Sequence, residues 1–140
     1  MEQIKKEKEE LEQRMKDFER HYMWVYHKKI AEHAGWLYRA GAPPEQANIP
    51  ELLVMGDLAR REKEWENAYA YYSRAYMRTD MPEGEDFAYT KYQGAAVNRL
   101  ERFVTQATKH LEEHRINPDR RRWVDMYIMS AEQITRRYKK

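Results

Sequence analysis

Residues 51–76 read ELLVMGDLARREKEWENAYAYYSRAY, and this stretch decides the fold. Small residues stand in it at Gly56, Ala68 and Ala75, and each of them allows a neighbouring helix to approach closely. Tyr72 lies between the two alanines and has the volume to fill the space that the small side chains leave. The pattern therefore predicts two helices in close contact, with a tyrosine packed between small residues.

Helical periodicity continues on both sides of this stretch. Gly41 and Pro43 predict the end of a long first helix, because glycine and proline disfavour a helix interior. Pro50 predicts the start of a second helix, which extends to about Glu62. The remaining helices are expected over residues 64–79, 83–115 and 118–140. No segment alternates between apolar and polar residues as a strand does, so the sequence predicts an all-α protein.

Three of the expected helices carry an apolar stripe. The stripe of the first helix is Ile4, Leu11, Met15, Phe18, Tyr22, Val25 or Tyr26, Ile30, His33 and Leu37. The stripe of residues 83–115 is Tyr92, Ala96, Leu100, Phe103, Ala107, Leu111 and His114. In the last helix the expected buried face is Trp123, Tyr127, Ala131, Ile134 and Tyr138. Such spacings predict helices that bury one side, although the first stripe is too mixed to define a coiled coil.

A chain of 140 residues has room for one domain, which we divide into residues 1–41, 49–82 and 83–140. The sequence has no cysteine, which excludes disulfide bonds, cysteine-ligated zinc, iron–sulfur clusters and thiol catalysis. No apolar run approaches the roughly 18 residues of a membrane-spanning helix, and the opening residues are charged. We therefore expect a cytoplasmic protein that does not associate with membranes.

Residues 49–82 resemble a tetratricopeptide repeat (TPR), a helix–turn–helix unit of 34 residues. The positions that match the family's pattern of large and small residues are Leu52, Met55, Gly56, Trp65, Ala68, Tyr72 and Ala75. Ala59 departs from it, because the family usually has an aromatic residue there. The resemblance implies a TPR-like hairpin, flanked by longer antiparallel helices in a small solenoid-like domain.

The resemblance also implies a function, because TPR domains hold a peptide or a partner helix on the face that their first helices line. We therefore expect a non-enzymatic protein- or peptide-binding module, such as an adaptor, a chaperone or a sequestering regulator. The residues expected to contact the partner are Leu53, Val54, Asp57, Arg60, Arg61 and, as an exposed apolar contact, Tyr71. Asp57 beside two arginines favours a peptide that carries both charges. A solvated helix face with one local ion pair is the alternative interpretation of these residues.

The C-terminal segment supports a second hypothesis for function. Residues 115–140 contain eight Lys or Arg and three Asp or Glu, so this segment has a charge of +5 and the remainder −3. The arginines that would contact nucleic acid are Arg120, Arg121, Arg122, Arg136 and Arg137. Basic residues beside aromatic ones, here Trp123 and Tyr138, are typical of nucleic-acid-binding surfaces. A solubilising helix face explains the same charges without a partner.

One motif has the form of a catalytic site. His110, Glu113 and His114 match the His-x-x-Glu-His spacing of inverted zinc metallopeptidases, in which both histidines share a helix face. A third, acidic ligand would have to come from downstream, where Asp119, Asp125 and Glu132 are available. Both histidines also border the apolar stripe, so partial burial explains them without a metal. We therefore expect no metal, no cofactor and no enzymatic activity, with a zinc hydrolase as the alternative.

The first helix is the expected surface for self-association. Residues 5–10 are all charged, so the opening turns should project into solvent or pair with another chain. The apolar stripe extends beyond what the rest of the chain can cover, and the charges beside it alternate in sign. A homodimer through this helix is therefore one hypothesis for the partner.

Overall fold

A computed structural model describes residues 2–79 and 87–139, without the side chains of residues 15, 17–26 and 87–91. Its elements are α1 (Glu2–Arg39), the short 3-10 helix η1 (Pro44–Gln46), α2 (Ile49–Arg61), α3 (Trp65–Thr79), α4 (Phe87–Glu113) and α5 (Pro118–Lys139). These residues contain no strand, so the protein is all-α, as the sequence predicts. The expected start of a helix at residue 83 lies outside the described residues.

Asparagine side chains close the first turns of α2 and α5. The Asn48 side chain accepts a hydrogen bond from the Glu51 amide at 2.9 Å, and the Glu51 carboxylate accepts one from the Asn48 amide at 2.9 Å. Asn117 Oδ1 accepts a hydrogen bond from the Asp119 amide at 2.9 Å. These bonds satisfy amides that have no partner inside the helix.

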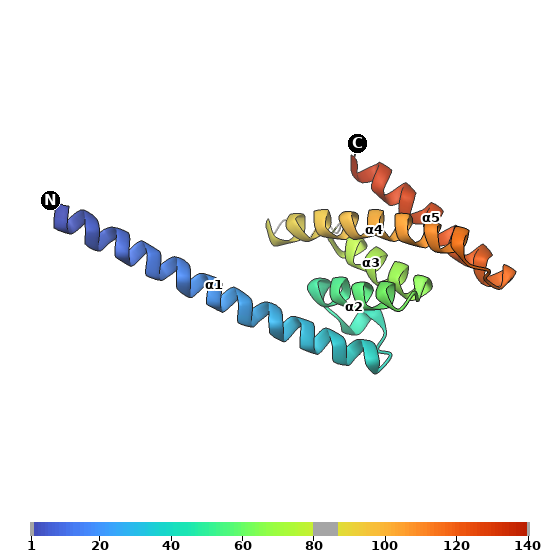
Figure 1. Cartoon of the computed structure of the whole chain (residues 1–140), viewed down its shortest axis with the longest axis horizontal. Coiled ribbons are helices and arrows are strands. Elements are labelled where there is room, and N and C mark those ends of the chain that lie inside the picture. Colours follow the sequence, from blue (N-terminus) through green and yellow to red (C-terminus); the bar gives the residue numbers. More distant parts are fainter. Residues whose placement is uncertain (1, 80–86, 140) are drawn as a thin grey trace.

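The helices pack on one another in chain order (Figure 1). α2 lies between α1 and α3, α3 packs on α4, and α4 packs on α5. α2 also contacts α4, and α3 also contacts α5. The N-terminal part of α1 extends away from the other helices (Figure 1). The body of the protein is therefore formed by the end of α1 together with α2 to α5.

The contact between α2 and α3 depends on the absence of a side chain at Gly56. Tyr72 is fully buried, and a Cβ atom added at Gly56 would lie 2.5 Å from Cδ1 and 2.9 Å from Cζ of its ring. Ala68 and Ala75, on the same side of α3, are also fully buried. The tyrosine ring thus lies directly against the backbone of α2, and the packing predicted from the small residues is confirmed.

α4 buries most of its predicted stripe. The buried residues are Ala96, Leu100, Phe103, Ala107 and Leu111, and Tyr92 is partly buried. Phe103 meets the edge of Trp65 with the ring centroids 6.1 Å apart, which joins α4 to the start of α3. His114 is exposed instead of continuing the stripe, because the helix ends at Glu113.

The predicted buried face of α5 is wrong at both ends. Trp123 is 53% exposed and Tyr138 is 43% exposed. The buried residues of α5 are Val124, Ile128 and Ala131, which are spaced by four and three. These smaller side chains allow α5 to approach α4. Trp123 immediately precedes the buried Val124 in the sequence and faces outward.

The apolar stripe of α1 is divided between the body and the projecting part. Leu37 is buried and Ile30 is half-buried, whereas Ile4 and Leu11 are exposed. The side chains of Met15, Phe18, Tyr22, Val25 and Tyr26 lie outside the described part of the chain.

We predict that Gly56→Ala destabilises the protein by about 1–3 kcal/mol, because the new methyl group overlaps the ring of Tyr72. Gly94→Ala is the matched control, since its Cβ would meet only the Tyr138 hydroxyl at 3.5 Å, an ordinary contact. That control should stabilise the helix by roughly 0.5–1 kcal/mol, as alanine usually does in place of glycine. Urea denaturation of both variants measures the difference, and equal effects would contradict the packing described here.

Candidate partner-binding face of α2 and α4

Asp57 is the central acceptor of a polar network that joins three helices. The Tyr72 hydroxyl on α3 donates a hydrogen bond to Asp57 Oδ1 at 2.5 Å. Arg99 on α4 donates from Nε to both carboxylate oxygens, at 3.1 and 3.2 Å. Arg60 lies one turn further along α2, with Nη2 3.6 Å from Oδ1. The negative charge of the Asp57 carboxylate is therefore balanced by the two arginines of the protein itself.

Arg60 has a structural role in the same network. Its Nε donates to the Tyr72 hydroxyl at 3.1 Å, and its Nη1 donates to Gln106 Oε1 on α4 at 3.0 Å. Only 13% of its side chain is exposed. The pairs Asp57–Arg99 and Arg60–Gln106 follow each other in the same order on both helices, so α2 and α4 run in the same direction.

The environment of Tyr72 keeps its hydroxyl protonated. Burial raises the pKa of Tyr72 well above its ordinary value, and the hydrogen bond to Asp57 raises this pKa further. The hydroxyl is therefore a hydrogen-bond donor to Asp57 throughout the neutral pH range. Tyr38, whose hydroxyl donates to Glu64 at 2.9 Å, has a pKa raised to about 12 by burial and by this hydrogen bond.

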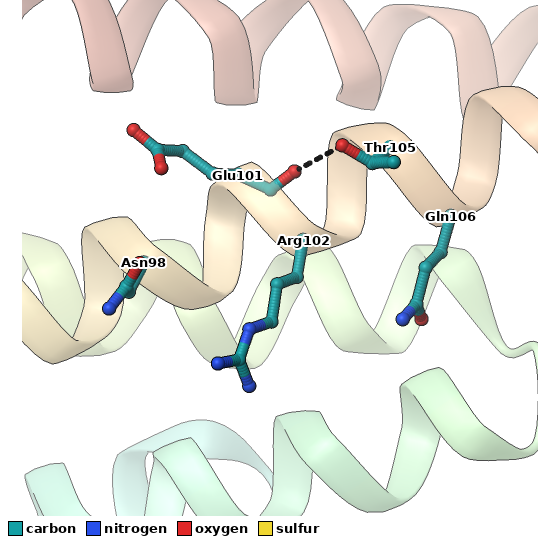
Figure 2. A pocket seen from close by; sticks show the side chains of 5 residues that line it. All are labelled: Asn98, Glu101, Arg102, Thr105 and Gln106. Atoms are coloured by element: carbon teal, nitrogen blue, oxygen red, sulfur yellow. Dashed lines mark hydrogen bonds between the residues drawn. The ribbon is translucent and has the colours of Figure 1, made fainter.

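An open depression of about 290 Å³ lies along α4 beside this network. Its lining residues are Asn98, Glu101, Arg102, Thr105 and Gln106. Figure 2 shows Asn98, Arg102 and Gln106 on one side of α4, and Glu101 and Thr105 on the side of α5. Glu101 pairs with Lys139 of α5 at 2.6 Å. Of the residues that line the depression, Glu101 is thus paired with α5, and Gln106 is hydrogen-bonded to Arg60 of α2.

Arg102 and Asn98 are the groups that this depression leaves available. Both side chains are exposed, and neither has a hydrogen bond or an ion pair with any side chain that the structure describes. We call these two residues, together with Arg60, Arg61, Arg99 and Gln106 around Asp57, the α2–α4 face. Four arginines and one aspartate give this face a net positive charge.

The structure corrects two of the residues expected to contact a partner. Tyr71 is 7% exposed and Leu53 is 4% exposed, so both belong to the core. Tyr69 packs on Phe103 of α4 and Tyr127 of α5, whereas Tyr71 lies on another side of α3, close enough to Tyr38 of α1 to affect its pKa. Leu53 lies on α2, which is enclosed by α1 and α3.

The other expected residues lie at or near the α2–α4 face. Val54 is partly buried against the core, and Arg61 is exposed at the end of α2. The residues that α4 contributes were missed, because they lie outside the stretch that resembles a TPR. Asn98, Arg102 and Gln106 are four residues apart, and this polar spacing on a predicted helix was the signal that could have identified them.

Several of the C-terminal arginines are used within the protein. Arg120 donates to Glu66 at 3.0 Å and to the Lys63 carbonyl at 3.0 Å, which fastens α5 to the turn before α3. Arg121 donates to the Leu111 carbonyl at 3.4 Å. Arg136 pairs with Glu132 at 3.6 Å on the same helix. Arg122 and Arg137 are exposed, and neither forms an ion pair among the described residues.

The two histidines of the His-x-x-Glu-His motif lie side by side at the end of α4. Their ring centroids are 4.5 Å apart, and the His110 ring packs on Trp65 at 5.4 Å. No group of three His, Cys, Asp or Glu side chains in the described part of the chain is arranged to hold a metal ion. Burial lowers the pKa of His110 below its ordinary value, and the charge of His114 lowers it further.

None of the helices described has both the length and the apolar character needed to cross a membrane. No model of a known protein family matches the chain, and neither the curated proteins nor the solved structures contain a significant match to it. Function is therefore inferred from the geometry of the α2–α4 face.

The lowered pKa of His110 predicts that the protein loses stability in mild acid. The folded state disfavours the protonated ring, so the unfolded chain binds more protons once the pH falls through about 6.5. Thermal unfolding should therefore show a lower Tm at about pH 5.5 than at about pH 7.5. The His110→Gln variant should show a smaller decrease, and an identical pH profile for both proteins would exclude this role for His110.

Proposed function

We propose that this protein is a non-enzymatic binding module that holds an acidic segment of a partner protein on the α2–α4 face. The observation that carries this proposal is the exposed guanidinium of Arg102, which lies at the open depression on α4 and has no ion pair among the described residues. An arginine can bind a carboxylate through two parallel hydrogen bonds, which gives orientation as well as attraction. No ion pair within the described chain competes for it.

The neighbouring groups suit a peptide. The Asn98 amide offers both a donor and an acceptor, the two groups that pair with a peptide backbone. It lies one helical turn from Arg102 on the same side of α4 (Figure 2). Arg61 adds a second exposed positive charge at the end of α2.

The hydrogen bonds that Asp57 already accepts narrow the kind of peptide that the face can bind. The sequence favours a peptide with both charges only if Asp57 is available to it. Tyr72 and Arg99 donate to this carboxylate at 2.5 and 3.1 Å, so a cationic group of a partner would have to displace them. The positive charges that remain on the face favour an acidic peptide.

The resemblance of residues 49–82 to a TPR supports the same location, since the first helices of that family line its binding groove. α2 is the first helix of the TPR-like stretch, and α4 lies beside it in the same direction. We include three roles for the module in this proposal: an adaptor, a chaperone or a sequestering regulator. The identity of the partner decides among them.

The proposal is tested with labelled peptides of equal length and stepped net charge, measured by fluorescence anisotropy. We expect affinity to increase with the number of acidic residues and to decrease as salt concentration rises. Arg102→Glu should weaken binding of the most acidic peptide about tenfold or more, because it replaces an attraction by a repulsion. The Tm should change little, since Arg102 is exposed and unpaired within the described chain.

Arg122→Glu is the matched control, because Arg122 is also an exposed arginine without an ion pair among the described residues, located on α5. It should leave peptide affinity unchanged. Single-stranded DNA serves as a competing probe. If DNA binds more tightly than every peptide, and Arg122→Glu reduces this binding more than Arg102→Glu does, the basic C-terminal helix is the binding surface and the proposal is wrong.

A further inference from the structure

The N-terminal part of α1 stands clear of the body of the protein. Residues 2–14 are exposed, and among the described side chains of the helix the first buried one is Ala34. From Glu2 to Ile30 the helix rises by roughly 40 Å, at about 1.5 Å per residue. Most helices in proteins are stabilised by packing of an apolar face, and residues 2–14 have no such packing within the described chain.

The exposed apolar residues of α1 fall in one heptad frame. Ile4 is 72% exposed and Leu11 is 59% exposed, and the two are seven residues apart. If both occupy position d, Trp36 occupies position a of the same frame, and it is 60% exposed. The frame also places apolar residue types at position d of the next two heptads, at 18 and 25 in the sequence. Repetition every seven residues is the pattern of a coiled-coil seam. Lys29 and Glu32 occupy positions a and d of the same frame, so the whole stripe is mixed and the seam is confined to the N-terminal part of α1.

This seam differs from the side of α1 that packs on α2. The buried residues Ala34 and Leu37 occupy positions f and b of the frame, which lie on the opposite side of the helix from a and d. A second helix can therefore lie along the seam without displacing α2.

The charges beside the seam determine the direction of that second helix. Lys5 and Glu12 occupy position e, and Glu7 and Arg14 occupy position g. In a parallel pair g faces e of the next heptad, which would place Glu7 opposite the partner's Glu12. In an antiparallel pair e faces e and g faces g, so Lys5 meets the partner's Glu12 and Glu7 meets the partner's Arg14. None of these four side chains forms an ion pair within the described chain.

We propose that two copies of this chain associate through an antiparallel coiled coil of the N-terminal segments of their α1 helices. Because the pair of helices has two-fold symmetry, the ion pair between Lys5 and Glu12 and the one between Glu7 and Arg14 each form twice. Leu11 packs on the aliphatic stem of the partner's Lys8 near the centre of the pair. The two bodies then lie at opposite ends of the coiled coil, roughly 60 Å apart at about 1.5 Å per residue, and both α2–α4 faces remain accessible.

Charge-reversed variants of the full-length chain test this pairing by sedimentation equilibrium. Glu7→Arg places two arginines opposite each other, and Arg14→Glu places two glutamates opposite each other, so each variant alone should dimerise about tenfold more weakly. An equimolar mixture of the two variants should restore the association, because both arginines of the Glu7→Arg chain then face the two glutamates of the Arg14→Glu chain. Circular dichroism checks that each variant keeps its helix content.

Glu9→Arg is the matched control, since Glu9 occupies position b on the outer side of the helix. It should not change the association. A wild-type chain that stays monomeric at high micromolar concentration overturns the proposal. So does tighter association of Glu7→Arg, which indicates a parallel pair, and so does a mixture that associates no better than its components.

Discussion

The rest of the structure depends on the contact between the backbone of α2 at Gly56 and the ring of Tyr72 on α3. A buried aromatic ring needs close partner atoms around it, and here part of that contact comes from a helix backbone rather than from side chains. This arrangement is available only to glycine, which has no Cβ atom to keep the ring away. Ala68 and Ala75 bring the two helices together on either side of the ring. The close approach of α2 and α3 therefore depends on small residues, and at Gly56 the ring leaves no room for a Cβ atom.

The same ring carries the polar group that organises the surface. Because the ring lies directly against α2, its hydroxyl reaches Asp57 one residue beyond Gly56. Asp57 accepts a hydrogen bond from Arg99, and Arg60 donates one to Gln106. Both Asp57 and Arg60 are hydrogen-bonded to the Tyr72 hydroxyl, so this tyrosine connects the residues of α2 that orient α4. Arg102 is left outside this network. The core contact thus leads to a network that uses Arg60 and Arg99, whereas Arg61 and Arg102 are exposed.

Much of the fold could be predicted from the sequence, and less of the site. Gly56, Ala68, Ala75 and Tyr72 define a local pattern whose physical meaning does not depend on distant residues, so the helical hairpin was predicted correctly. Tyr71 was expected to be exposed, because its neighbour Tyr38 comes from α1, and the position of that helix is tertiary information. Trp123 was assigned to the core by its spacing from Tyr127 and Ala131, whereas the residues of α5 that are buried include the smaller Val124 and Ile128. Arg99 was missed, because its hydrogen bonds to Asp57 of α2 depend on the packing of two helices and leave no trace in the pattern of one.

Gly56 is required because the ring of Tyr72 occupies the space that a side chain at this position would fill. A double-mutant cycle between Gly56→Ala and Tyr72→Leu measures this dependence directly through the free energies of unfolding. In the Tyr72→Leu background the ring is gone, and Gly56→Ala should cease to destabilise and should instead stabilise the protein by roughly 0.5–1 kcal/mol, as in an ordinary helix. If Gly56→Ala costs the same in both backgrounds, the contact between Gly56 and Tyr72 does not set the spacing of α2 and α3.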